Sequence, residues 1–374
     1  MSWPQALAWR LGRQLLTEPR GSVVEAARRV AGVQAQVMSS AELAVGVRTA
    51  LTPASVRNAL WTDRTLVKTW AMRGTLHLLP ADELPIWVAA LRAKEQSARR
   101  GAAWERYHGI TVAQLELTTA AIGQVLGVTP MTRQELGAAV ASVTGDESLA
   151  EVVRTAFGGT ILKSAAANGD LCFAPDRGRN VTFVDARAWL GGHWQEPEPE
   201  LATAVIAHRF FDAYGPATVD DFARWWGVPA AAGKRLLRPL IDDLVGVDVD
   251  GTAALVTPAG AAALAATKPV RGHVRLLPAF DTYVLAPRSH RGHSWPEGLH
   301  ARISRPAGWI TPVLVVEGKI AGVWANERQG GSVRFEVEPL TPLTRSIRAA
   351  AEAQARSYEA LLDAPVEVSW VEQT

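Results

Sequence analysis

Two glutamines, Gln34 and Gln36, lie in an otherwise apolar stretch from Ala31 to Val37, and their type and spacing suit one kind of chemistry. An amide side chain accepts and donates hydrogen bonds but does not titrate. A pair of amides can therefore hold a water molecule in line without taking its proton, as a carboxylate base would, and forgoes roughly 10²–10⁴-fold of base catalysis. Such a site suits only a reaction whose leaving group is already activated. The alternative is that both amides cap backbone groups between packed helices.

The segment that carries the glutamines must present both side chains to the same place. Ser39 followed by Glu42 is a capping-box pattern, which predicts a helix from about Ser40 to Arg48. The glutamines would then lie just before this helix in a turn or an extended segment, where side chains two apart point the same way. Inside a helix they would diverge.

Around this segment, the sequence predicts two helices followed by a β-hairpin. This order of elements is the pattern of a winged helix. Helices are expected at residues 3–16, 22–30 and 53–61, followed by a hairpin of residues 66–71 and 75–79. Arg73 would lie at the turn and His77 on the return strand, where a wing can contact phosphates or the minor groove. The alternatives are a solvated turn residue for Arg73 and a packing role for His77.

The same order appears twice more along the chain. The second copy has a capping box at Thr132 and Glu135, one long helix at residues 149–167, and strands at 171–174 and 181–184. The third has helices at residues 218–227 and 228–240 and a hairpin turned at Asp250–Gly251. The alternating Pro and Glu of residues 195–200 predict a linker.

We therefore predict a mixed α/β, mainly α, fold of three tandem winged helix-turn-helix units. They occupy residues 1–101, 102–195 and 200–266, and a C-terminal β-rich region follows at residues 267–374. In that region, strands at residues 273–277, 310–316, 320–326 and 333–337 would form a small sheet or barrel closed by a helix at residues 343–362.

Composition points to a cytoplasmic protein with no membrane partner. The chain has 374 residues, 48% of them hydrophobic, and no run of the roughly 18 apolar residues that a membrane span needs. Its single cysteine, Cys172, excludes an internal disulfide and a thiolate-rich zinc site. No phosphate-binding or dinucleotide-binding motif is present, so we expect no cofactor and no metal.

Charge is unevenly distributed, although the net charge is only +2. Residues 268–310 carry seven Lys or Arg against two acids, whereas acids predominate between residues 185 and 250. The arginines Arg288, Arg291, Arg302 and Arg305 predict a loop that contacts phosphates, with Trp295 stacking on a base. The alternative for this loop is a metal held by His290, His293 and His300.

Four segments resemble a known family, namely residues 34–36, 72–77, 276–281 and 309–324. They are similar to the winged-helix DNA glycosylases typified by AlkZ, in which a Gln-aliphatic-Gln motif is the catalytic signature. Here Ala35 is the middle residue. The resemblance implies excision of bulky N7-alkylguanines, and in some members the unhooking of interstrand crosslinks made by the producer's own antibiotic. Gln36, where one related branch has Asp, indicates the crosslink-unhooking branch.

We thus predict a monofunctional DNA glycosylase, acting as a monomer on double-stranded DNA with alkylated purines. N7-alkylation makes guanine a cationic leaving group, so Gln34 and Gln36 would need only to orient water against C1′ of the sugar. Asp281 would pair with an arginine, or it would support the catalytic residues indirectly by holding their neighbours in place. The alternatives are a non-catalytic winged-helix DNA-binding protein, such as a transcription regulator or lesion sensor, and a structural or protein-interaction role without DNA.

Overall fold

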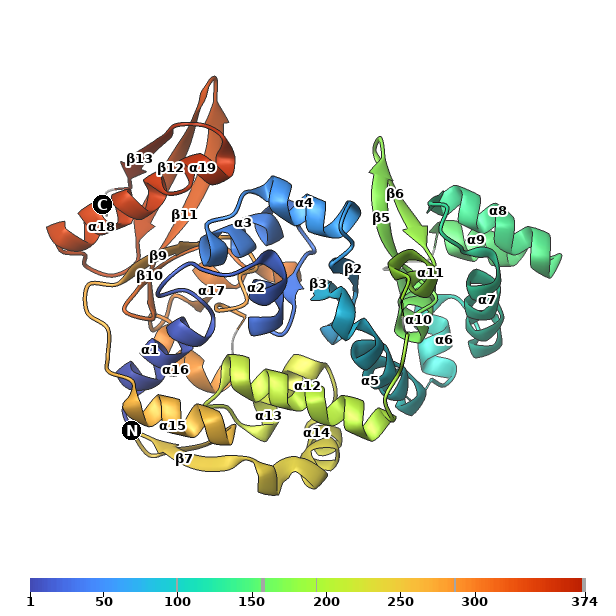
Figure 1. Cartoon of the computed structure of the whole chain (residues 1–374), viewed down its shortest axis with the longest axis horizontal. Helices are drawn as coiled ribbons and strands as arrows, with labels where there is room; N and C mark the ends of the chain where they lie inside the picture. The colour runs from blue at the N-terminus through green and yellow to red at the C-terminus, as the bar shows by residue number, and fades with distance from the viewer. Residues whose placement is uncertain (99, 156–158, 193, 286, 372–374) are drawn as a thin grey trace. The chain divides into compact units, whose positions relative to one another are not determined.

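The computed structural model describes residues 1–98, 100–155, 159–192, 194–285 and 287–371, which divide into two compact units (Figure 1). The first unit joins Met1–Arg57 to Ala207–Thr374, and the second is Asn58–Ile206. The chain therefore leaves the first unit and later returns to it. The predicted divisions at residues 101, 195 and 266 rest on local patterns and remain predictions.

Helices open the first unit and hold the glutamine segment between them. The elements are α1 (Trp3–Arg13), α2 (Val23–Arg29), β1 (Val33–Gln34), α3 (Met38–Thr49) and α4 (Pro53–Trp61), which runs on into the second unit. Ser2 and Ser22 begin α1 and α2, because each side chain accepts a hydrogen bond from a first-turn amide. The predicted helices and the extended conformation at Gln34 are confirmed.

Helix α3 begins differently from the prediction. Its N-cap is Val37, with no side-chain cap, so the predicted capping box of Ser39 and Glu42 is wrong. Glu42 is 4% exposed and instead accepts hydrogen bonds from Arg57 at 2.6 and 3.0 Å. The ion pair with α4 uses the carboxylate that a capping box would need.

A five-stranded sheet forms the C-terminal part of the first unit. Its strands are β9 (Val274–Leu277), β10 (Val313–Val316), β11 (Lys319–Gln329), β12 (Ser332–Pro339) and β13 (Val366–Trp370), in the order β13-β12-β11-β10-β9. Neighbours from β9 to β12 are antiparallel, whereas β12 and β13 are parallel and joined through α18 (Arg345–Arg356) and α19 (Glu359–Leu362). The four predicted strands are confirmed, β13 was not predicted, and the sheet is open and not a barrel.

The core of this region lies between the sheet and α18. Trp324 of β11 stacks on Phe335 of β12 with ring centroids 4.7 Å apart. Tyr358 donates a hydrogen bond to the carbonyl of Leu276, and Ala351 and Ala355 of α18 are fully buried in the same cluster. The small alanines let the helix approach the sheet closely.

A helix-helix-hairpin segment also belongs to the first unit. Its elements are α12 (Pro199–Tyr214), which begins in the second unit, α13 (Val219–Trp226), α14 (Ala230–Leu237), η4 (Arg238–Asp243), β7 (Val245–Val249), β8 (Thr252–Val256) and α15 (Pro258–Ala266). Thr218 and Asp221 form a capping box at the start of α13. The predicted hairpin is confirmed, and it turns at Asp250–Gly251, both with positive φ.

Short helical turns connect β9 to β10 and contain the predicted phosphate-contacting loop. They are η5 (Arg288–His290), α16 (Arg291–Ser294), α17 (His300–Ile303) and η6 (Pro306–Gly308).

The second unit contains two hairpins and the helices around them. Its elements are β2 (Leu66–Trp70), η1 (Met72–Gly74), β3 (Leu76–Pro80), η2 (Ala81–Glu83), α5 (Leu84–Ser97), α6 (Ala102–His108), α7 (Val112–Val125), β4 (Met131–Thr132), α8 (Arg133–Thr144), α9 (Glu147–Thr155), α10 (Thr160–Asn168), β5 (Cys172–Arg177), β6 (Asn180–Val184) and α11 (Ala186–Leu190). The predicted pairings of β2 with β3 and of β5 with β6 are confirmed. The capping box at Thr132 and Glu135 is present.

One prediction for the second unit is wrong, and one predicted linker is held more firmly than expected. The single helix expected at residues 149–167 is two helices, α9 and α10, and residues 156–158 lie outside the described part. The expected linker is anchored, because Glu196 binds Arg92 at 2.7 Å and Arg187 at 3.1 Å. Alternating Pro and Glu did not prevent packing, since two arginines partner the carboxylate.

Cys172 lies at the start of β5 and is fully buried. Burial raises the pKa of its thiol, because the thiolate is costly to form away from water. The chain's one cysteine is therefore unreactive in the folded protein.

Candidate functional site

Gln34 is held in extended backbone with its side chain almost fully enclosed. Ala31 and Gly32 both have positive φ, +51° and +98°, and turn the chain from α2 into β1. The side chain of Gln34 is 7% exposed, and within the described residues its buried Oε1 atom receives no hydrogen bond. A buried acceptor without a donor costs about 1–3 kcal/mol. Such an atom marks a place where a water or substrate donor is expected.

Gln36 differs from Gln34 in its surroundings. It is exposed and lies directly before Val37, the N-cap of α3, whereas Ala35 between the two glutamines is fully buried. One amide is thus enclosed and the other accessible to solvent. Within the described residues, Oε1 of Gln34 caps no backbone group.

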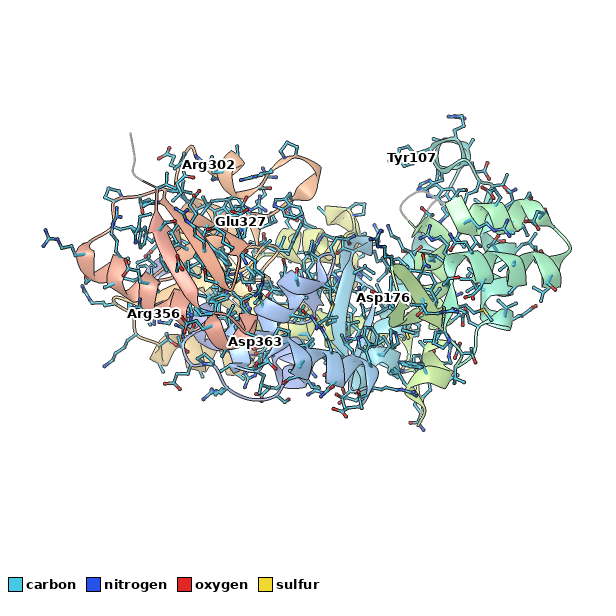
Figure 2. All side chains as sticks on the ribbon, turned by 90° about the horizontal axis from the view of Figure 1, so that it is seen from above. Tyr107, Asp176, Arg302, Glu327, Arg356 and Asp363 are labelled. Atoms are coloured by element: carbon cyan, nitrogen blue, oxygen red, sulfur yellow. The ribbon has the colours of Figure 1, made fainter. Side chains whose placement is uncertain are left out.

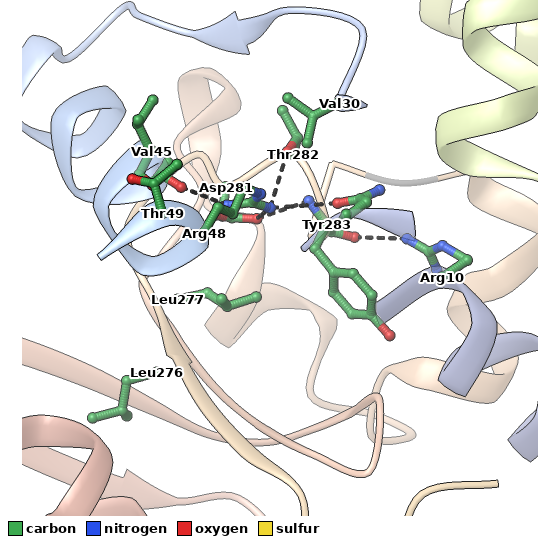
Figure 3. A network of polar contacts seen from close by, with 12 residues as sticks. Arg10, Val30, Val45, Arg48, Thr49, Leu276, Leu277, Asp281, Thr282 and Tyr283 are labelled. Carbon is green, nitrogen blue, oxygen red and sulfur yellow. Dashed lines mark hydrogen bonds and ion pairs between the residues drawn. The ribbon is translucent and has the colours of Figure 1, made fainter. Parts of the chain in front are cut away.

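A buried ion pair fixes the helix that follows the glutamines. Arg48, near the end of α3, binds both carboxylate oxygens of Asp281, with Nη1–Oδ2 at 2.7 Å and Nη2–Oδ1 at 2.8 Å (Figure 3). The two side chains are 1% and 0% exposed. Arg48 also donates to the carbonyl of Ala44 at 2.8 Å. The predicted pairing of Asp281 with an arginine is confirmed, and a bidentate pair in this environment sets α3 in one position.

Other contacts join the same network. Gln14, the residue that follows α1, accepts a hydrogen bond at its Oε1 from Arg48 Nη2 at 3.4 Å. Its Nε2 donates to the carbonyl of Ala213 at 3.0 Å. Tyr214 at the end of α12 donates its hydroxyl hydrogen to the carbonyl of Val30 at 2.9 Å, just before the turn into β1. The glutamine segment is therefore held on both sides, by Tyr214 ahead of it and by Arg48 behind it.

A second buried arginine organises the loop after β9. Arg10 lies 4.4 Å above the ring of Tyr283, and its Nη1 is 2.8 Å from Nδ1 of His290 (Figure 3 shows Arg10 and Tyr283). Since arginine only donates, His290 Nδ1 accepts, and its Nε2–H donates to the carbonyl of Pro216. Burial is the main cause that lowers the pKa of His290 to about 3.

This arrangement leaves neither ring nitrogen of His290 for a metal. His293 is stacked on Trp3 with ring centroids 4.0 Å apart, and His300 meets the edge of Trp295. In the described part of the chain, no group of three His, Cys, Asp or Glu side chains is arranged to hold a metal ion. The structure therefore does not bring His290, His293 and His300 together as a set of metal ligands.

The predicted phosphate-contacting loop is only partly accessible. Arg288 and Arg305 are exposed. Arg302 reaches the surface, where it forms an ion pair with Glu338 (Figure 2). Arg291 is half-buried over the ring of Trp295 at 4.5 Å.

Trp295 does not fit the role predicted for it. It is 7% exposed and belongs to the hydrophobic core, with Arg291 over its ring. Its enclosed ring contradicts the expected stacking of Trp295 on a base. The residue also lines a cleft of about 750 Å³ with residues 292–297 and 341–344, and neither Gln34 nor Gln36 lines that cleft.

In the second unit, Arg73 is exposed to solvent, whereas His77 is buried. Arg73 is exposed at the tip of the β2–β3 hairpin with φ of +56°. His77 is 2% exposed, and its Nδ1 donates to the carbonyl of Thr75 at 2.9 Å. Burial, followed by the charge of Arg73, lowers the pKa of His77 to about 3. The packing alternative for His77 fits this position better than a DNA contact.

Sequence reasoning missed several residues around these sites. Arg48, Tyr214 and Arg10 make the contacts that position the loop and helix segments, yet no local motif marks them.

Comparison with known proteins places these features in a family. Residues 27–361 match the family model described as DNA glycosylase AlkZ-like. The chain is 38% identical over 329 residues to the interstrand DNA cross-link repair glycosylase of Streptomyces sahachiroi, covering 86% of this chain and 87% of that protein. The solved structure of S. sahachiroi DNA glycosylase AlkZ superposes with a TM-score of 0.88 at 34% identity, covering 99% of this chain and 100% of that one.

No helix within the described residues is both long and apolar enough to cross a membrane. The matched family model spans both glutamines, Arg48 and Asp281. By its sequence and its fold, the chain belongs to the AlkZ-like family of DNA glycosylases.

Proposed function

We propose that this DNA glycosylase hydrolyses the N-glycosidic bond of N7-alkylguanine in duplex DNA, including guanines joined in interstrand crosslinks. The name of the S. sahachiroi relative, a cross-link repair glycosylase, supports the substrate. The observation that carries the mechanism is the Oε1 atom of Gln34, which is buried and lacks a donor among the described residues. We assign that acceptor to a hydrogen of the attacking water.

In this reaction the protein need not act as a general acid or a general base. N7-alkylguanine leaves as a neutral base because it carries a positive charge in the substrate, so no general acid is required. Bond breaking gives an oxocarbenium-like sugar, and the water oxygen then forms a bond to C1′ while its proton passes to solvent. Gln34 holds one water hydrogen through Oε1 and Gln36 orients the same water from the solvent side. Positioning of this kind lowers the entropic barrier to attack.

The buried network supplies rigidity to this arrangement. Asp281 acts through Arg48 on α3, and Tyr214 acts through Val30 on the turn before β1. Neither touches the substrate in this proposal, so both are positioning residues. A displacement of about 1 Å at an oriented water can cost roughly 10²-fold in rate. The buried polar contacts of Asp281 and Tyr214 would prevent such a displacement.

The proposal extends to how DNA is bound. The three helix-helix-hairpin segments act as winged-helix units, and the β2–β3 hairpin with Arg73 at its tip acts as a wing on the sugar-phosphate backbone. Arg288 and Arg305 are exposed and suited to phosphate contacts, whereas Arg302 would first have to leave Glu338. The enzyme works as a monomer, which sedimentation in the presence and absence of duplex tests.

Excision assays test the function directly. The protein is incubated with duplex containing one N7-methylguanine and, separately, with an N7-linked crosslink, and heat or alkali then cleaves the abasic sites. We expect Gln34→Ala and Gln36→Ala to bind duplex as tightly as the wild type and to lose roughly 10²-fold in excision rate. Gln124→Ala, which changes an exposed glutamine on α7, is the matched control and should be fully active.

Two outcomes would count against the proposal. Excision at the wild-type rate by both glutamine variants would remove these residues from the mechanism. Duplex binding by the wild type without any abasic product would instead favour a non-catalytic DNA-binding protein.

A further inference from the structure

Trp309 is an exposed aromatic side chain on a narrow loop of the first unit. All fourteen tryptophans lie in the described part of the chain, and Trp309, at 43% exposed, is the most accessible of them. A β-bridge between Ser304 and Ile310 closes the loop, and η6 forms its turn. The backbone N–H of Arg305 donates to the carbonyl of Trp309 at 2.8 Å. An exposed arginine and an exposed tryptophan therefore stand side by side on one loop.

The ring of Trp309 rests against Phe280, whose backbone is strained. The two ring centroids are 4.9 Å apart with an angle of 74° between the planes, which is an edge-to-face contact. Phe280 is 8% exposed and has φ of +58°, a left-handed conformation that a bulky side chain adopts only at an energetic cost. Its N–H donates to the carbonyl of Ile310, the residue after Trp309, at 3.4 Å. Strain of this kind persists where the surrounding structure holds it in place, and it is concentrated at functional sites.

The strained residue also connects Trp309 to the helix that follows the glutamines. Asp281 comes directly after Phe280 and binds Arg48 of α3 through both carboxylate oxygens. At the other end of α3, the N-cap residue Val37 packs against the hydrophobic cluster that contains Phe280. All of these residues belong to the first unit. The exposed ring and the glutamine segment are therefore attached to one packed core.

A flat indole beside a guanidinium matches two features of damaged DNA. Aromatic side chains stack on bases of any sequence, because every base has a π-face, and arginine binds the phosphates between them. In an intact duplex, neighbouring bases cover both faces of a base. A protein that contacts such a face must open the stack, and the side chain that it inserts replaces part of the lost contact. The cost of opening is lower at a damaged base.

We propose that Trp309 stacks on a nucleobase that adjoins the damaged guanine, while Arg305 binds the neighbouring phosphate. The inference rests on the proposed function, because it takes damaged duplex DNA as the substrate. It gives Trp309 the contact that the enclosed ring of Trp295 does not make. Because the ring of Trp309 is attached to the same core as α3, stacking holds the damaged strand in register with the glutamine segment.

Duplex affinity and its salt dependence separate stacking from charge. The probe is a duplex that carries a tetrahydrofuran abasic analogue, which the enzyme cannot hydrolyse. We expect Trp309→Ala and Trp309→Leu each to weaken binding roughly tenfold, and Trp309→Tyr to bind as tightly as the wild type, because only tyrosine keeps an aromatic face. None of the three should change the slope of the logarithm of the binding constant against the logarithm of salt concentration. Arg305→Gln should make that slope less negative by about 1, because it removes a phosphate contact.

Matched variants separate stacking on a base from packing within the protein. Tyr107→Ala removes an aromatic ring that is 78% exposed on α6 of the second unit, and it should bind as the wild type does. Urea denaturation of each variant checks that the fold is intact. If Trp309 served only to cover Phe280, leucine would cover it as well. Wild-type affinity in a folded Trp309→Leu or Trp309→Ala protein would therefore overturn the proposal.

Photo-crosslinking identifies the contact in the wild-type protein, so it needs no folded variant. Iodouracil replaces the thymine next to the abasic analogue, long-wavelength ultraviolet light links it to a stacked aromatic ring, and mass spectrometry identifies the labelled residue. We expect the label on Trp309 and none on Tyr107.

The crosslink also distinguishes this inference from the proposed function. A wild-type enzyme that excises N7-methylguanine but is labelled only at other residues would refute the inference and leave the proposed function intact. The absence of abasic product from N7-methylguanine would refute the proposed function, and the inference with it.

Discussion

At the scale of single residues, the Arg48–Asp281 pair has the largest energetic consequence. Both groups are buried and bonded to one another twice. Removing one partner leaves an uncompensated charge in the interior, which costs about 3–5 kcal/mol. We expect Arg48→Met to lower the free energy of unfolding by that amount in urea denaturation, and Arg48→Met/Asp281→Leu to recover most of it.

The control for this prediction is another arginine in an ion pair. Arg177 binds Glu135, and these side chains are 54% and 49% exposed, so Arg177→Met should cost no more than about 1 kcal/mol. Equal losses for Arg48→Met and Arg177→Met would show that burial does not set the cost of breaking these ion pairs.

The sequence predicted the local conformation and the kind of contact made near the site, but it did not predict which distant residue makes each contact. The extended conformation at Gln34 and the need of Asp281 for an arginine both followed from local pattern. The identity of that arginine did not, because Arg48 and Asp281 are 233 positions apart. Trp295 was misjudged because its neighbours are charged, yet its own ring packs into the core.

At the scale of elements, the turn between α2 and β1 depends on one hydroxyl. Tyr214 holds the carbonyl of Val30, so Tyr214→Phe leaves that buried acceptor without its donor. We expect the variant to lose about 1 kcal/mol of stability and to excise N7-methylguanine more slowly, with unchanged duplex affinity. Slower excision should appear in single-turnover rates at saturating enzyme. Tyr107→Phe changes a tyrosine that is 78% exposed on α6 (Figure 2) and should match the wild type in all three measurements.

Elements fixed by local chemistry were predictable, and elements fixed by distant partners were not. The hairpins followed from alternation and from turn residues such as Asp250–Gly251, and the capping box at Thr132 followed from spacing alone. Ser39 has the same spacing to Glu42, but Arg57 takes that carboxylate, so the helix begins earlier. Strand β13 was missed because only its pairing with β12 defines it.

At the scale of the whole molecule, two buried histidines make stability depend on pH. His77 and His290 lie one in each unit, and burial lowers the pKa of each to about 3. In the unfolded chain a histidine takes up a proton below about pH 6.5. The unfolded state therefore binds more protons between pH 6.5 and 3, and stability is fully present above pH 6.5 and is lost as the pH falls.

The expected loss is about 2 kcal/mol for each histidine at pH 5. Urea denaturation at pH 7.5 and pH 5 measures it. His290→Asn should reduce the difference between the two pH values, and His300→Asn, which changes an exposed histidine, should not. Identical unfolding curves at both pH values for the wild type would show that these imidazoles titrate normally.

The burial of Cys172 gives this enzyme a practical property. Because the native thiol is enclosed and resists ionisation, a cysteine introduced on the surface would be the one reactive thiol in the folded chain. A thiol-bearing oligonucleotide could then be tethered at one chosen position, such as the tip of the β2–β3 hairpin. A covalent complex of this kind would hold the enzyme on duplex DNA for crystallisation, and Cys172 would not need to be replaced first.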